Sequence, residues 1–232
     1  MASQVVQLKH IGKVTFSQNK RSKNIKLSVK PDKSVLVSFP FFVSPKEAMA
    51  FVVKNEHWVL KQQEKMQARS TTIKPGTEIE TKLHKIHIVQ GEKNDANREG
   101  DNITISVSDF ENEESIAFID DIVTTVYRHE AKRLLPVRIS DLAKKHGFNY
   151  NKVTIRNNRR NWGSCSSKNN ISLNLQMMKL PVKLIDYILL HELVHTEIKN
   201  HGPKFWERLN QITDGKAREL AREVKKHSTY TM

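Results

Sequence analysis

The chain has 232 residues, with 39 Lys and Arg against 25 Asp and Glu, a formal net charge of +14, and a single cysteine. A chain of this length can bury roughly 70% of its unfolded surface, so it can build a core without disulfides, and one cysteine excludes an intramolecular disulfide. The single cysteine fits a reducing cytoplasm, and no segment approaches the ~20 consecutive apolar residues of a membrane span, so we expect a cytoplasmic protein that does not enter a membrane.

The first forty residues predict a small antiparallel sheet. Strand-like runs occupy residues 13–16, 24–29 and 34–39, bounded by polar clusters. Ser44 then precedes Pro45 and Glu47 in the order that begins a helix, and apolar residues recur at helical spacing afterwards. We therefore expect one long helix over about 45–68, with Trp58 as a core anchor.

Residues 70–111 return to strand character, with runs over 77–81, 85–89 and 103–107 and a polar loop over 91–102. From Ser115 the pattern is helical. We expect Pro136 to end this helix and a short second helix to run from Ser140 to Gly147. His129 and Glu130 are not followed by a second histidine four residues on, so we do not assign them as metal ligands. We place them on the helix surface or, at most, in contact with residues that bind a metal. The pattern divides the chain into residues 1–110 and 111–232.

Residues 152–181 alternate like paired strands joined by a segment rich in Asn, Gly and Ser. Pro181 closes this unit and begins a helix, VKLIDYILLHELVH. The helix is apolar on most sides, so we expect it to be buried between layers.

The end of that helix carries a pattern typical of a zinc site. His191 and His195 are four residues apart, so both imidazoles can reach one ion on the same helix face. Glu192 lies beside that face. A carboxylate there can take a proton from water whose pKa the metal has lowered to about 7 and pass it to a leaving amine. This is the HExxH arrangement of zinc peptidases.

His201 is the candidate third ligand, because a catalytic zinc normally has three protein ligands. On a continuous helix it would face away from the ion, so the helix must end first. Asn200 suits a left-handed turn, and Pro203 suits the start of a new helix. The metzincin pattern has the same histidine spacing but a glycine where this chain has Ile198, which counts against a metzincin.

NWGSCSSKNNISLNLQMMKLP followed by YILLHELVHTEIKNHGPKFW resembles the YgjP-like zinc metallopeptidases. The resemblance is close over about residues 120–210 and looser before them, and the His201 element is also similar to SprT-like proteases. It implies one Zn²⁺ held by His191, His195 and His201, with Glu192 as general base. The implied fold is α+β: a β-rich N-terminal part followed by a zincin-like metallopeptidase domain.

Other residues near the motif can have either functional or structural roles. Arg156, Asn157 and Asn174 can orient substrate or support the ligands, since strands beside a metal helix often bind peptide by edge addition. Tyr187, one turn before His191, can stabilise an oxyanion or be a buried, hydrogen-bonded tyrosine. Cys165 is better interpreted as a packed thiol than as a nucleophile.

Two functions remain open. The first is a zinc metallopeptidase acting on proteins or peptides. The second is a nucleic-acid-associated basic module, in which zinc is structural or the enzyme cleaves proteins bound to nucleic acid. Dispersed surface charge is the simpler explanation of +14, although residues 152–168 form a denser basic run. Imidazole ligands also accept cobalt, nickel or copper.

Overall fold

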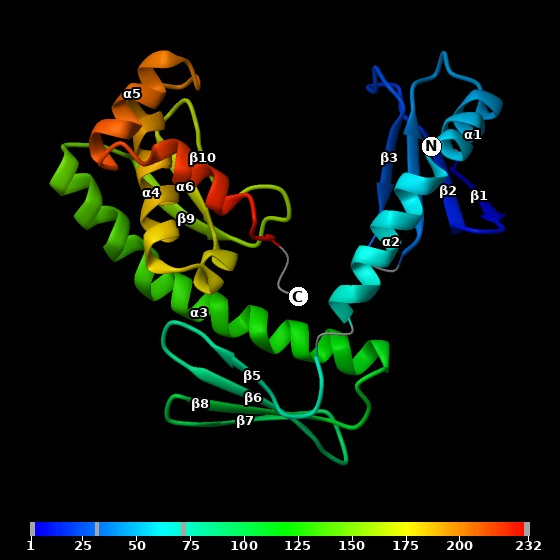
Figure 1. The fold of residues 1–232 in the computed structure, drawn as a ribbon, viewed down its shortest axis with the longest axis horizontal. Helices are drawn as coiled ribbons and strands as arrows, with labels where there is room; N and C mark the ends of the chain where they lie inside the picture. Colours follow the sequence, from blue (N-terminus) through cyan, green and yellow to red (C-terminus); the bar gives the residue numbers. More distant parts are fainter. Residues whose placement is uncertain (1–2, 31–32, 71–72, 230–232) are drawn as a thin grey trace. The chain divides into compact units, whose positions relative to one another are not determined.

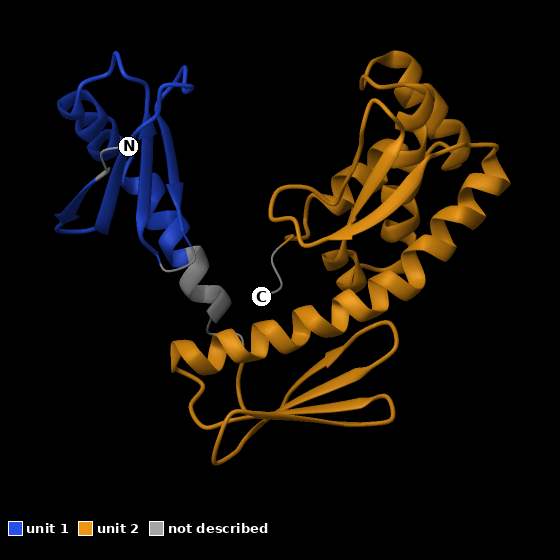
Figure 2. Ribbon diagram, turned by 180° about the vertical axis from the view of Figure 1, so that it is seen from behind, with its two compact units in different colours: residues 1–72 blue, residues 73–232 orange. Residues whose placement is uncertain are grey.

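The computed structural model describes residues 3–30, 33–70 and 73–229. The chain forms two compact units, Met1–Thr72 (unit 1) and Ile73–Met232 (unit 2) (Figure 2). Helices and strands are mixed in both, in agreement with the expected α+β class. The expected boundary at residue 110 falls inside unit 2, just after its first sheet.

Unit 1 is a four-stranded sheet with two helices (Figure 1). The strand order is β1-β2-β4-β3, and the β2–β4 pair is parallel, so the sheet is mixed rather than antiparallel as predicted. The elements are β1 (Ser3–Leu8), β2 (Gly12–Gln18), β3 (Lys26–Val29), β4 (Val35–Phe39), α1 (Pro45–Lys54) and α2 (Glu56–Ser70).

One face of this sheet is buried. Val14, Phe16, Val35 and Val37 alternate with polar neighbours along β2 and β4, so all four project from the same face. They share a hydrophobic core with residues of α1 and α2. The opposite face is polar and carries small hydroxyl side chains such as Ser28.

The predicted helix over 45–68 is interrupted at Asn55. The Asn55 side chain donates to the carbonyl of Phe51 at 2.7 Å and ends α1, and α2 begins at Glu56. The predicted start is confirmed, because Ser44 and Glu47 form a reciprocal capping box. Trp58 is 44% exposed, so the expectation that it anchors the core was wrong.

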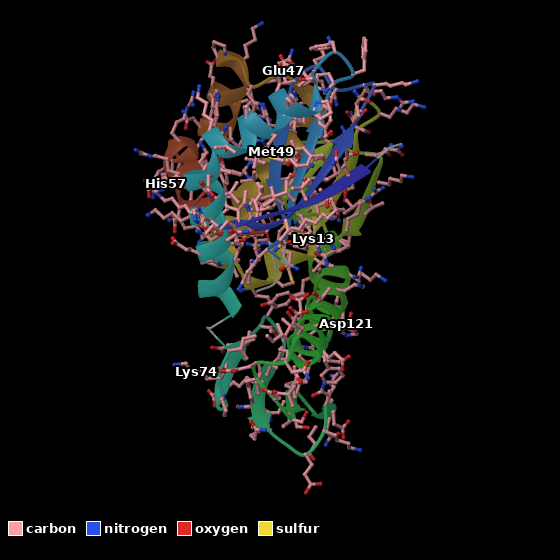
Figure 3. All side chains as sticks on the ribbon, turned by 90° about the vertical axis from the view of Figure 1, so that its right-hand side faces the viewer. Lys13, Glu47, Met49, His57, Lys74 and Asp121 are labelled. Atoms are coloured by element: carbon pink, nitrogen blue, oxygen red, sulfur yellow. The ribbon has the colours of Figure 1, made fainter. Side chains whose placement is uncertain are left out.

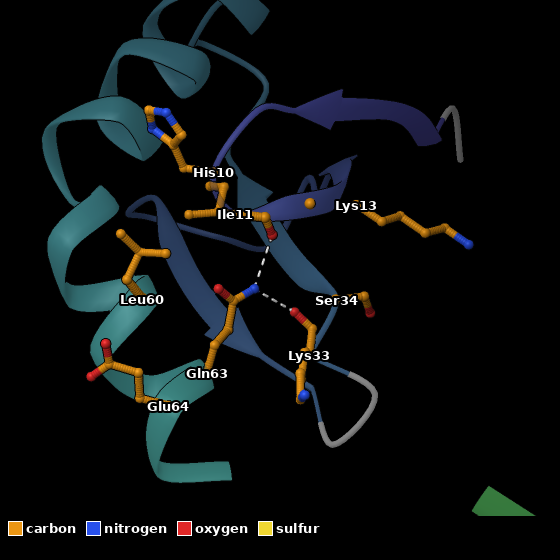
Figure 4. Close-up of a pocket in the computed structure, with 9 residues that line it drawn as sticks. His10, Ile11, Lys13, Lys33, Ser34, Leu60, Gln63 and Glu64 are labelled. Carbon is orange, nitrogen blue, oxygen red and sulfur yellow. Dashed lines mark hydrogen bonds between the residues drawn. The ribbon is translucent and has the colours of Figure 1, made fainter. Parts of the chain in front are cut away.

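Gln63 joins α2 to the sheet. Its amide donates to the carbonyls of Ile11 at 2.9 Å and Lys33 at 2.7 Å, beside a pocket that also contains His10 and Leu60 (Figure 4). Because backbone carbonyls of two separate turns need a donor there, Gln63 fixes both turns against the helix.

Unit 2 begins with a second four-stranded sheet, in the order β5-β6-β8-β7. Its strands are β5 (Thr77–Glu80), β6 (Lys85–Gln90), β7 (Asp95–Glu99) and β8 (Asn102–Val107). The segment predicted to be a loop therefore contains β7, which forms a hairpin with β8. All five β7 side chains are exposed, so this strand shows no hydrophobic alternation in the sequence.

A single helix, α3 (Glu113–His146), follows this sheet. It continues through Pro136, where the sequence predicted an end. Leu135 and Ile139 are buried on either side of the proline, and their packing outweighs the ~3 kcal/mol that an interior proline costs. Gly147, in the left-handed region at φ 77°, caps the C-terminus as predicted.

The remaining elements position the histidine motif. They are β9 (Lys152–Arg156), β10 (Gly163–Cys165), β11 (Asn170–Asn174), the 3₁₀ helix η1 (Leu175–Lys179), α4 (Val182–Glu197), α5 (Pro203–Ile212) and α6 (Ala217–Val224). The sheet order is β10-β11-β9, with β9 and β11 parallel. Helix α4 contacts α3, β10, α5 and α6, which explains why it is apolar on most sides. Over the described ranges, no helix is both long and apolar enough to cross a membrane.

Candidate metal centre

Three imidazoles converge at the C-terminal end of α4. His191 and His195 lie one turn apart on the helix, and His201 follows it in the connection to α5. The Nε2 atom of His201 is 3.0 Å from that of His191 and 3.1 Å from that of His195. The three residues form the metal-competent group found among the described residues.

The chain brings His201 back by ending α4 early. The helix stops at Glu197, and Ile198 is extended with φ −122° and ψ 102°. The predicted turn at Asn200 was wrong in its geometry, because Asn200 does not have a positive φ. Pro203 begins α5 as predicted.

The ring nitrogens of His195 have distinct roles. Its Nδ1 lies 3.0 Å from the carbonyl oxygen of Ile198. A carbonyl only accepts, so Nδ1 carries the hydrogen and Nε2 keeps the lone pair that faces the other histidines. Burial lowers the pKa of His195. Burial, followed by the charges of His195 and His201, lowers the pKa of His191 to about 3.

These residues fit a zinc ion. Nitrogen ligands at 2.0–2.1 Å in tetrahedral geometry would lie about 3.4 Å from one another. The Nε2 pairs at 3.0 and 3.1 Å need to open by only a few tenths of an ångström. Because Nδ1 of His195 carries its hydrogen, Nε2 of His195 offers a lone pair to such an ion.

Glu192 is buried beside this group. Its side chain is 4% exposed, and its Oε2 has no hydrogen-bond partner within the described part of the chain. Desolvation raises the pKa of the Glu192 carboxyl to about 8. Gly163 on β10 makes the space, because a Cβ added there would lie 2.7 Å from both Cγ and Oε1 of Glu192.

Aromatic residues surround the histidines. The ring of Phe205 on α5 is fully buried and lies 4.6–4.9 Å from all three imidazoles, centroid to centroid. The Tyr187 ring lies 6.1 Å from that of His191, and burial raises the pKa of Tyr187 to about 12, so its phenol stays protonated. Arg218 stacks over Trp206 at 3.6 Å. The sequence resemblance to SprT-like proteases includes Phe205, but it did not predict that this ring contacts all three histidines.

Asn174 organises the loop between β9 and β10. It is fully buried, and its amide donates to the carbonyls of Asn158 at 2.6 Å and Asn161 at 2.9 Å. Asn157 accepts from Gln176 at 3.2 Å and is itself exposed. Arg156 is exposed at the end of β9.

Lys199 connects the segment that carries His201 to the β10–β11 turn. Its ammonium donates to the carbonyl of Ser166 at 3.0 Å and to Oδ1 of Asn169 at 2.5 Å. Burial raises the pKa of the nearby Cys165 thiol, so it lacks the lowered pKa of a nucleophile. The sequence carries no local signal for the Lys199 contacts, because they join residues about 30 positions apart.

Comparisons with known proteins identify the family of this chain. A family model described as "YgjP-like, metallopeptidase domain" matches residues 23–227. Similar solved structures include the metallopeptidase zymogens jannalysin of Methanocaldococcus jannaschii and abylysin of Pyrococcus abyssi, each 24% identical with a TM-score of 0.36. The matches cover 39% and 40% of this chain, and 93% and 94% of those chains, respectively. No curated protein matches the chain.

Proposed function

The chain belongs to the YgjP-like metallopeptidase family, and we propose that it hydrolyses peptide bonds with one zinc ion held by His191, His195 and His201. The convergence of the three Nε2 atoms carries this proposal. Its substrates are proteins or peptides. Since the single cysteine suits a reducing compartment, we place the enzyme in the cytoplasm.

Glu192 is the proposed general base. A zinc ion in this site would supply Lewis-acid polarisation of the scissile carbonyl and acidify water. In its ionised form, which a cation bound beside it would favour, the Glu192 carboxylate accepts the proton of the attacking water and returns it to the leaving amine. Because its Oε2 has no protein partner among the described residues, that oxygen is available for proton transfer. The Tyr187 phenol, which remains protonated, donates a hydrogen bond to the developing oxyanion.

The three-stranded sheet orients the substrate in this proposal. β10 is at the sheet's edge and contacts α4, so an extended peptide can pair with its outer backbone close to the histidines. Arg156 and Asn157 lie exposed at the end of β9, where they can contact substrate polar groups. Asn174 acts through the loop that its amide holds.

The Glu192→Gln substitution tests the mechanism. The amide is isosteric but cannot accept the proton, so we expect zinc content equal to wild type and a fall in peptide hydrolysis of at least about a hundredfold. Metal analysis and digestion of a peptide library measure the two quantities on one sample. Hydrolysis by the variant at the wild-type rate would show that Glu192 is not the base.

A nucleic-acid-associated function is the second candidate. The uneven distribution of charge favours it. Residues 1–72 contain 13 Lys and Arg against four Asp and Glu, so unit 1 carries +9 of the net +14 in less than a third of the chain. A polyanionic partner would explain this excess.

A further inference from the structure

Two loops of unit 1 leave the same end of its sheet. β2 and β4 are parallel and β3 is antiparallel to β4, so the β2–β3 loop and the β4–α1 loop meet at one end (Figure 1). The amide of Asn19 donates to the carbonyl of Phe39 at 2.8 Å, and the Gln18 side chain donates to the carbonyl of Phe41 at 3.3 Å. We call this surface, residues 18–26 with 40–43, the basic-aromatic end.

Two phenylalanines are exposed there. Phe41 and Phe42 are 66% and 65% exposed, and their rings form an edge-to-face pair with centroids 5.5 Å apart. Large apolar side chains that remain this exposed side by side indicate a binding surface. Phe16 and Phe39 of the same unit are buried, so the sheet does not lack room for apolar rings.

Basic side chains run from this end along β3. Lys20, Arg21 and Lys23 are exposed in the β2–β3 loop. Lys26 and Lys30 continue the series on the polar face of the edge strand, about 13 Å apart for four residues of extended chain. The positive charges therefore form a line rather than a cluster.

The described acidic residues of unit 1 are on its helices. They are Glu47, Glu56 and Glu64. Glu47 accepts from the backbone N–H and hydroxyl of Ser44, and Glu56 is hydrogen-bonded to His10. Glu47, labelled in Figure 3, lies in the first turn of α1, shortly after residues 40–43. No described carboxylate lies on β3 or its preceding loop to neutralise the line of charge.

We propose that the basic-aromatic end binds single-stranded nucleic acid, with bases stacked on Phe41 and Phe42 and phosphates along the line from Lys20 to Lys30. Stacking on an aromatic ring accepts any base, and lysines that follow a strand track a backbone without reading its sequence. The hydroxyl of Ser28, exposed between Lys26 and Lys30, can donate to phosphate as well.

The pairing of rings with a line of charge favours this partner over two others. An acidic peptide would use the lysines but has no flat rings that require Phe41 and Phe42. An anionic membrane would receive the phenylalanines but presents charge over a plane. The basic-aromatic end would be the binding surface of the second candidate function, and its binding of nucleic acid does not depend on peptidase chemistry.

Binding of a fluorescent thymidine oligonucleotide of about 15 nucleotides to the full chain, followed by anisotropy across salt concentrations, tests the proposal. With five phosphate contacts we expect a slope of about −3.5 in log affinity against log salt, at about 0.7 per contact. Lys20→Gln, Arg21→Gln and Lys23→Gln together should weaken binding at least tenfold and reduce the slope to about −1.4.

Substitution of the phenylalanines should affect affinity and its salt dependence differently from substitution of the lysines. Phe41→Ala with Phe42→Ala should weaken binding by about tenfold or more while leaving the salt slope unchanged. Phe41→Leu with Phe42→Leu keeps apolar area without an aromatic face and should weaken binding nearly as much. Wild-type affinity in the leucine variant would overturn the stacking role.

Lys9, Lys54 and Lys61 provide the matched control, because they are exposed in unit 1 but lie outside the basic-aromatic end and β3. Their triple Gln variant has the same net charge as the loop variant and should bind within about threefold of wild type, whereas equal loss in both would overturn the proposal in favour of diffuse charge. The proposal would also be overturned if polyglutamate competed for the protein as well as unlabelled oligonucleotide does. Binding of the protein to phosphatidylglycerol vesicles but not to oligonucleotide would overturn it too. Glu192→Gln should bind as wild type, so failure here is distinguishable from failure of the peptidase proposal.

Discussion

Gly163 controls the space that the Glu192 carboxylate occupies. A methyl group at this position would meet Glu192 Cγ and Oε1 at 2.7 Å, which is closer than packed atoms approach. Both atoms belong to the side chain that we propose as the base. We therefore propose that the glycine of the WGSCS segment is needed for this close approach rather than for backbone conformation, since its φ is not in the left-handed region.

We expect Gly163→Ala to lower peptide hydrolysis by roughly a hundredfold, because displacing a catalytic group by about 1 Å costs that much. Zinc content should stay near wild type, since none of the three histidines is touched. Gly202→Ala is the control, as an added Cβ there meets nothing within 4 Å. Equal activity losses in the two variants would contradict the steric explanation. Steady-state kinetics with metal analysis measures both effects.

Lys199 holds the backbone that presents His201. Lys199→Met removes the contacts with Ser166 and Asn169 but keeps the length of the side chain. We expect zinc affinity to fall about tenfold, which is the lower end of the effect of residues that support a ligand. Competition with a chromophoric chelator measures the affinity. Lys204→Met, on an exposed lysine of α5, should leave it unchanged.

At the residue scale, the spacing of His191, Glu192 and His195 is enough to predict that they share a helix face. The direction of His201 depends on a turn whose geometry the sequence did not predict, because Ile198 rather than Asn200 makes the change of direction. Gly163 could not be found from spacing, since its role depends on contact with a side chain 29 positions away.

At the scale of elements, Glu130 ties the first sheet of unit 2 to α3. It is fully buried, and its carboxylate accepts from the amides of Lys82 and Leu83 at 3.0 Å each and from Nδ1 of His84 at 2.8 Å. The Thr81 hydroxyl also contacts it. The prediction that Glu130 lies on a helix surface or behind the metal site was wrong, because its partners are more than 45 residues away in sequence.

Glu130→Ala should reduce the free energy of unfolding by about 3–5 kcal/mol, since it leaves buried donors without an acceptor. Glu130→Gln keeps one carbonyl acceptor and should cost less. Asp121→Ala, on an exposed residue of the same helix, should change stability by no more than about 0.5 kcal/mol. Chemical denaturation monitored by circular dichroism measures the free energy of unfolding of the three variants. Equal stability of all three would show that Glu130 does not stabilise the contact between this sheet and α3.

Periodicity predicted most elements and failed where packing or exposure overrode it. Strands β2, β4, β6 and β8 alternate and were found, whereas β7 has five exposed side chains and could not be distinguished from a loop. Pro136 destabilises α3 only near its own position in the helix. The buried neighbours that maintain α3 through it belong to the tertiary core.

At the scale of the whole molecule, the two units have separate hydrophobic cores. The core of unit 1 contains residues from Val6 to Leu60, and that of unit 2 contains residues from Ile73 to Val224. The sequence could not predict this division. Both units begin with strands, so the strand pattern after residue 72 does not by itself mark a new unit, and the polar stretch near residue 100 was the stronger local signal.

A fragment of residues 73–232 should therefore fold alone. It contains α4, the three histidines, Glu192 and β10, and no described residue of unit 1 belongs to its core. We expect it to bind about one zinc ion per chain and to cleave a short peptide within about threefold of the full chain, because the proposed chemistry uses only unit 2. It should lose affinity for the oligonucleotide, since Phe41, Phe42 and the line of lysines are absent. A folded fragment that binds zinc but cannot cleave the short peptide would show that unit 1 completes the active site, and one that still binds the oligonucleotide would place nucleic-acid binding in unit 2.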